Sequence, residues 1–169
     1  MNYDWIKTRA AYDEVKPAII DPFKGKSCSY QDLNKRAENL AGHLKNEGIG
    51  QGDVVGIFAP NDVSLLDLLF ATTKLGAVYL PINWRLKPKE IENVITDSNV
   101  KHIFYAAKHL SSLQGMADDL LYMDVDSTEY DQIVDPTNHK PFESVEVEGD
   151  TLAILMYTSG TTGLPKGVM

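Results

Sequence analysis

A loop rich in glycine and hydroxyl side chains, near the end of the 169-residue sequence, has the composition of a phosphate-binding site. Glycines lack a Cβ atom, so the backbone can turn sharply and approach a ligand, and successive N–H groups in such a turn bind anions. Four hydroxyls within five positions and one lysine add further donors: Thr158, Ser159, Gly160, Thr161, Thr162, Gly163, Lys166 and Gly167. Charge-assisted hydrogen bonds to phosphate contribute about 1.5–3 kcal/mol each, so several together would hold a triphosphate.

Two other interpretations fit this loop less well. A flexible Ser/Thr/Gly linker usually lies between domains, whereas this loop follows an apolar stretch and ends in Pro-Lys-Gly. A Walker A loop needs lysine directly after its last glycine and before Ser or Thr, so that the hydroxyl reaches magnesium. Here two residues separate Gly163 from Lys166, and Gly167 follows. The order of residues therefore disfavours a P-loop NTPase.

Helices and strands alternate before this loop. Ser29, with Asp32 three residues on, predicts a helix start, and Gly48 predicts its end. Helices are also predicted over 63–75, after the caps Asn61 and Asp62, and from Pro88 onward. Apolar strands are predicted over 53–59, 77–82 and 102–106, and a further buried strand over 152–157 leads into the loop. This alternation predicts an α/β fold with a parallel sheet covered by helices.

The segment YTSGTTGLPKGVM, at 157–169, resembles the signature of the AMP-forming adenylate superfamily, which includes acyl-CoA synthetases, luciferases and peptide-synthetase adenylation domains. The segments GIGQGDVVGIFAP (48–60) and LGAVYLPIN (75–83) resemble other parts of that family. PINWRL (81–86) is similar to the same position in bacterial fatty-acid and other acyl-CoA ligases. The resemblance covers nearly the whole chain and is weakest in an acidic stretch at 124–150.

The resemblance implies that residues 1–169 are the N-terminal part of the large AMP-binding domain, an incomplete adenylate-forming fold without its C-terminal domain. The phosphate-binding loop then spans 157–168. Its members assigned to the ATP phosphates are Thr158, Ser159, Gly160, Thr161, Thr162, Gly163 and Lys166, with Lys166 and Thr161 expected to act in catalysis. The implied substrates are a carboxylic acid (a fatty acid is one option), MgATP and coenzyme A. No metal-binding side chain is assigned.

Three functions stay open. The first is part of an acyl-CoA ligase, inactive as an isolated fragment, because the family's adenine-, ribose- and acyl-binding segments lie downstream of this motif. The second is a truncated, non-catalytic module that binds a nucleotide or another subunit. The third is a fragment of a peptide-synthetase adenylation domain, which would need a carrier-protein partner.

Charge and composition narrow the possible partners and cellular compartment of the protein. The net charge of −8 disfavours nucleic acid as a partner. Cys28 is the only cysteine and is expected to be a small, buried or half-buried residue; one cysteine and no apolar membrane-length stretch or signal peptide favour a cytoplasmic protein. The four histidines lack metal-ligand spacing. Residues 124–150 are expected to form an acidic surface segment, and Trp84 and Arg85 either a packed loop or an interaction site. An unpaired apolar sheet edge predicts self-association.

Overall fold

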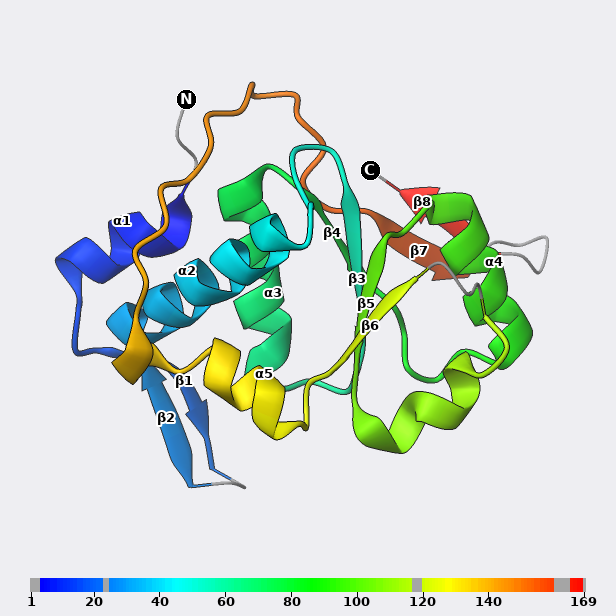
Figure 1. Cartoon of the computed structure of the whole chain (residues 1–169), viewed down its shortest axis with the longest axis horizontal. Coiled ribbons are helices and arrows are strands. Elements are labelled where there is room, and N and C mark those ends of the chain that lie inside the picture. The colour runs from blue at the N-terminus through cyan, green and yellow to red at the C-terminus, as the bar shows by residue number, and fades with distance from the viewer. Residues whose placement is uncertain (1–3, 23–24, 117–119, 160–164, 169) are drawn as a thin grey trace.

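A four-stranded parallel sheet forms the centre of the computed structural model, which describes residues 4–22, 25–116, 120–159 and 165–168 (Figure 1). The strand order is β4-β3-β5-β6. The bounds are Val54–Phe58 for β3, Val78–Pro81 for β4, His102–Tyr105 for β5 and Leu121–Asp124 for β6. In the middle of the register, Val55 lies opposite Tyr79 on one side and His102 on the other. The predicted α/β fold and parallel sheet are confirmed, and β6 is a strand that the sequence pattern did not predict.

Helices cover both faces of this sheet (Figure 1). On one face lie α2 (Tyr30–Asn46) and α3 (Val63–Leu75), with α1 (Trp5–Tyr12) and α5 (Thr128–Ile133) packed around α2. On the other face lie α4 (Pro88–Ser98) and the 3-10 helix η1 (Ala107–Leu113). Two apolar clusters match the two faces. Neighbouring strand residues point to opposite clusters, Ile57 to the α2–α3 side and Phe58 to the α4 side, as the period of a strand requires.

The helix ends form largely as predicted. The Ser29 side chain accepts a hydrogen bond from the Asp32 N–H at 3.0 Å, and Gly48 has a positive φ of 85° just after α2. Asp62 occupies the N-cap of α3 but makes no side-chain capping bond. Pro88 begins α4, and the Glu90 carboxylate accepts the Lys87 N–H at 2.8 Å. These capping residues determine where each helix begins or ends.

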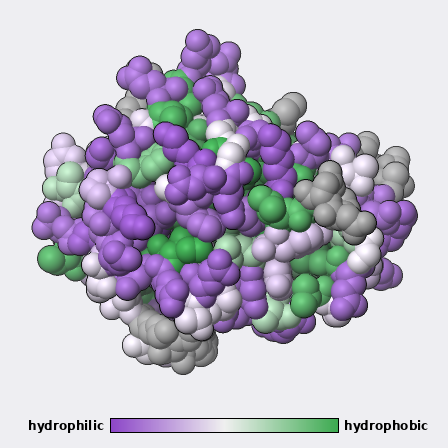
Figure 2. All heavy atoms as spheres, in the orientation of Figure 1, coloured by the Kyte–Doolittle hydropathy of each residue, from purple (hydrophilic) through white to green (hydrophobic). Residues whose placement is uncertain are grey.

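Peripheral elements surround this core. The strands β1 (Pro17–Asp21) and β2 (Lys26–Ser29) form a two-stranded antiparallel ribbon. Cys28 in β2 is half-buried, as expected, and burial raises the pKa of its thiol to about 11, so the reactive thiolate is scarce at neutral pH. Figure 2 shows hydrophilic residues over most of one face of the molecule. Within the described residues, no helix has the length and apolar character needed to cross a membrane.

The acidic stretch is more structured than its composition indicates. It holds the end of β6, the short helix α5 and the 3-10 turn η2 (Pro136–Asn138). Most of its side chains are exposed or half-buried, but Tyr130 and Val134 are buried in the core. The Tyr130 hydroxyl donates to Asp67 on α3 at 2.9 Å. Apolar residues scattered through the acidic stretch, such as Ile133 beside Val134, were the sequence signals of this packing.

The predicted buried strand over 152–157 is wrong in part. A single parallel bridge joins Ile154 to Tyr79 of β4, supported by hydrogen bonds from Tyr79 N to Ala153 O (2.9 Å) and from Leu155 N to Tyr79 O (3.0 Å). The chain then enters β7 (Met156–Ser159), where Met156 is 52% exposed. Within the described residues this segment has a sheet neighbour on one side only, so its apolar residues are half-covered and not enclosed.

Candidate active site

The described ends of the predicted phosphate-binding loop lie on the two paired strands of a β-hairpin. Strand β7 pairs antiparallel with β8 (Pro165–Val168), and the register places Thr158 opposite Lys166 and Ser159 opposite Pro165. The two ends of the predicted loop are therefore held side by side, as a compact phosphate-binding turn requires. Gly160, Thr161, Thr162 and Gly163 lie outside the described residues, so their roles stay predictions.

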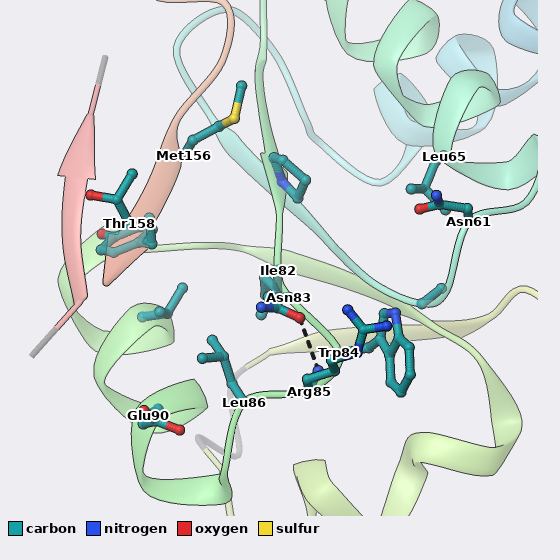
Figure 3. Close-up of a pocket in the computed structure, with 14 residues that line it drawn as sticks. Asn61, Leu65, Ile82, Asn83, Trp84, Arg85, Leu86, Glu90, Met156 and Thr158 are labelled. Atoms are coloured by element: carbon teal, nitrogen blue, oxygen red, sulfur yellow. Dashed lines mark hydrogen bonds between the residues drawn. The ribbon is translucent and has the colours of Figure 1, made fainter. Parts of the chain in front are cut away.

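A cavity of about 580 Å³ lies beside this hairpin (Figure 3). One wall comes from the segments that follow two neighbouring parallel strands, with Asn61 after β3 and 82–86 after β4. Glu90 and Val94 of α4 line another wall, and Thr158 lines the side of the hairpin. Open α/β sheets bind their ligands at the carboxyl ends of the strands, which is where this cavity lies. The structure thus brings one predicted phosphate ligand, Thr158, to the sheet edge where ligands are expected.

The segment after β4 both packs and lines the cavity. The Trp84 ring lies 5.4 Å from the His109 ring, which in turn meets Phe58 edge-on at 5.6 Å. The Arg85 guanidinium stacks over Trp84 at 4.6 Å, and the Asn83 side chain accepts the Arg85 N–H at 3.0 Å (Figure 3). Trp84 is therefore a packed residue, while Arg85 brings a positive charge to the cavity wall. The packed-loop interpretation therefore holds for Trp84, and an interaction site at Arg85 stays a prediction.

Tyr157 joins the hairpin to α4. Its hydroxyl donates to the Asp97 carboxylate at 2.6 Å, and its ring lines the cavity. Burial, together with the hydrogen bond to the negative Asp97, raises the pKa of this phenol well above its usual range. The hydroxyl therefore keeps its proton, and remains a donor, at any physiological pH.

Some residues at this site were missed by sequence reasoning. Asp97 is one of many acidic residues on an exposed helix surface, 60 positions before its partner, so no local pattern marks it. His109 lies in η1, and only the fold brings it against Trp84. Tyr157 begins the resembling motif but was assigned no role. No group of three or more His, Cys, Asp and Glu side chains in the described part of the chain is arranged to hold a metal ion.

Comparison with known proteins identifies the family to which this fold and loop belong. The sequence profile described as "AMP-binding enzyme" matches residues 6–169. The chain belongs to the AMP-binding enzyme family. Among its relatives, a feruloyl-CoA synthase from Amycolatopsis sp is 34% identical over 145 residues, which cover 86% of this chain and 28% of the synthase. A long-chain-fatty-acid–CoA ligase, FadD13 from Mycobacterium tuberculosis, is 32% identical and matches 99% of this chain and 34% of the ligase.

A solved structure shows the same fold. The inhibitor-bound N-terminal domain of FACL13 from Mycobacterium tuberculosis superposes with a TM-score of 0.86 at 32% identity, covering 99% of this chain and 43% of that domain. The resemblance to the adenylate-forming family, stated from the motif, is therefore confirmed. The chain spans about a third or less of the length of the curated relatives described above.

Proposed function

We propose that this chain is part of an AMP-forming acid–thiol ligase and that its hairpin loop holds the β- and γ-phosphates of ATP. The observation that carries the proposal is the register of the hairpin, which sets Thr158 opposite Lys166 beside a cavity at the carboxyl edge of the sheet. Hydroxyls, backbone N–H groups and one lysine at this place match a polyanion. The loop follows a strand, and its lysine lies on the return strand, an order that differs from that of a P-loop NTPase.

The proposed reaction has two steps. A carboxylate oxygen attacks the α-phosphorus of ATP, so that a C–O–P linkage forms and pyrophosphate leaves. The sulfur of a thiol such as that of coenzyme A then attacks the acyl carbon, and AMP leaves with the electron pair of the broken C–O bond. Negative charge shifts toward the pyrophosphate in the first step, so donors aimed at those oxygens favour the transition state over the ground state.

The residues of this chain divide that work. The hydroxyls of Thr158, Ser159, Thr161 and Thr162 and the loop amides would orient the triphosphate, and the ammonium of Lys166 would offset the charge of the departing pyrophosphate. Magnesium would enter on the phosphates and neutralise part of their charge. The relatives compared above are named for an aromatic acid and for long-chain fatty acids, so a carboxylic acid with an apolar body is the substrate class to test first. A single cysteine is consistent with a reducing, cytoplasmic setting.

The test is acid-dependent exchange of labelled pyrophosphate into ATP, measured on the full-length protein with ferulate and with fatty acids of increasing length. We expect Lys166→Ala to slow the exchange by about 10²-fold or more, as removal of one charge-stabilising donor does elsewhere. Lys45→Ala is the matched control, because Lys45 lies on α2 and contacts the Phe142 ring on the opposite side of the sheet. That variant should exchange like the wild type.

Two outcomes would contradict the proposal. An exchange rate that Lys166→Ala leaves unchanged would remove the loop from the reaction. If the full-length protein showed no exchange with any acid while the 169-residue polypeptide bound MgATP in calorimetry, a non-catalytic nucleotide-binding module would replace the ligase.

A further inference from the structure

The hairpin that carries the loop has little support of its own. It is a two-stranded sheet, and an isolated two-stranded hairpin is marginally stable in water. Immediately before it, the main chain is tied to β4 through Ala153 and Leu155. Its position relative to the cavity therefore depends on side-chain contacts made by β7 and β8.

Tyr157 makes two such contacts at once. Its hydroxyl donates to Asp97 in the last turn of α4 at 2.6 Å. Its ring lies against the backbone of β8, because a Cβ atom built on Gly167 would be 3.5 and 3.6 Å from the ring atoms Cζ and Cε1. Gly167 is the cross-strand partner of Tyr157 and the residue next to Lys166. One side chain thus connects α4 to both strands of the hairpin.

The hydrogen bond between Tyr157 and Asp97 is also well placed to position the hairpin. Thr158, which follows Tyr157, faces the cavity, so a shift of Tyr157 moves the first phosphate-binding residue directly. Among the side chains that the structure describes, the bond to Asp97 is the one side-chain hydrogen bond from the hairpin to the rest of the chain. The ring packs with the α4-side apolar cluster, which limits the directions in which it can move.

We propose that Asp97 and Tyr157 form a latch that holds β7 and β8, the strands from which the predicted phosphate-binding loop departs, beside the cavity. This inference rests on the proposed function, because it assigns the latch to the binding of the ATP phosphates. Neither residue needs to touch the nucleotide: Asp97 holds Tyr157, and Tyr157 holds the two strands from which the loop departs. They are positioning residues, and their loss should weaken the binding of ATP more than that of the acid.

The first test is the pyrophosphate exchange of the full-length protein. Tyr157→Phe removes the donor and keeps the ring, and Asp97→Ala removes the acceptor. We expect each to raise the KM for MgATP about 3- to 10-fold, the range that one hydrogen bond supports, with the KM for the acid changed less than twofold. Asp97→Asn keeps an acceptor oxygen and should stay within twofold of the wild type for both. Tyr12→Phe, on exposed α1, is the matched control for loss of a phenol.

The second test needs no activity. Hydrogen–deuterium exchange of the backbone at 156–168, without nucleotide, should be faster in Tyr157→Phe and Asp97→Ala than in the wild type, Asp97→Asn and Tyr12→Phe. Unchanged exchange and unchanged KM for MgATP, in an active wild-type protein, would overturn the latch and leave the proposed function intact. Equal rises in both KM values together with a lowered melting temperature would also overturn it, because they would show general destabilisation. An inactive wild type would instead overturn the proposed function.

Discussion

Lys74 is a fully buried charge on a helix predicted from its apolar residues. Its ammonium nitrogen lies 2.7 Å from the Asp4 carboxylate and 3.7 Å from that of Glu38, and it donates to the Asn34 side chain at 2.8 Å. Burial alone raises the pKa of Asp4, but the hydrogen bonds from Lys74 and Ser144 outweigh it and hold this pKa below its usual 3.8. Lys74 thus joins α1, α2 and α3 around one buried cation.

The first prediction concerns this cation. Lys74→Met should lower the free energy of unfolding of the full-length protein by about 3–5 kcal/mol in urea denaturation, because it removes the buried ammonium that contacts the Asp4 and Glu38 carboxylates. The pKa of Asp4 is lowered in the folded state, so its contribution to stability is present at neutral pH. That contribution is lost as the pH falls below about 3.8.

The matched control is Lys89→Met. Lys89 is exposed on α4 and pairs with Glu92 at 2.9 Å, and such a surface pair contributes only about 0–1 kcal/mol. Equal unfolding midpoints for the two variants would show that the buried charges do not stabilise the packing of α1 against α2 and α3.

At the scale of an element, the end of α3 is set by Gly76. This residue has a φ of 65°, in the left-handed region, and its N–H closes the last turn of the helix on Thr73. The extended end of the acidic stretch crosses here: a Cβ atom at Gly76 would lie 2.9 Å from Val147 Cγ1 and 3.1 Å from Val145 Cγ2. Gly76 therefore serves both the helix end and a close approach between segments 70 positions apart.

Gly48 allows the cost of the left-handed backbone to be measured without that of a close approach. It has a φ of 85°, but a Cβ atom there would meet nothing within 4 Å. We expect Gly48→Ala to cost about 1–2 kcal/mol from the left-handed backbone alone. Gly76→Ala should cost about 1–3 kcal/mol more, because Val145 and Val147 must shift. Urea unfolding of both variants measures the difference, and equal losses would mean that the crossing segment yields without strain.

At the scale of the whole molecule, one edge of the sheet is formed by the segment around Ile154, which bonds to β4 on one side and leaves its other side unpaired within the described residues. Tyr79 bonds to Ala153 and Leu155, so the N–H and C=O of Ile154 between them point away from β4, as in any parallel ladder. Within the described residues nothing pairs with this side, and Met156 and Val168 close to it are 52% and 53% exposed. Such an edge is a template for another chain.

The last prediction follows from this edge. The 169-residue polypeptide should elute above its monomer mass of 18.8 kDa in size-exclusion chromatography with light scattering, increasingly so at higher concentration. Met156→Lys and Val168→Lys should shift it toward monomer. Ile20→Lys, at an even more exposed apolar position on the β1–β2 ribbon, should not. A monomer at every concentration would contradict the prediction, and dissociation by Ile20→Lys alone would move the interface to the ribbon.

Much of the fold follows from local pattern. The bounds of α3, the cap at Ser29 and the start of α4 at Pro88 agree with the sequence prediction, because each depends on residues a few positions away. Strand β6 and helix α5 were missed. The apolar run that ends at Met123 is short and lies between acidic residues, and Tyr130 stands between Glu129 and Asp131. Pairing with β5 and the contact with α3, which local pattern does not record, fix these two elements.

For the candidate site, the sequence by itself determined which chemistry to expect, because the hydroxyls, glycines and lysine of the loop are close together and their order separates them from a P-loop. Only the tertiary structure decided what surrounds that loop. Asp97 meets Tyr157, and His109 meets Trp84, because strands β3, β4 and β5 align their carboxyl ends and α4 crosses beside them. Contacts between residues 25 or 60 positions apart depend on strand order and helix packing, which no local spacing records.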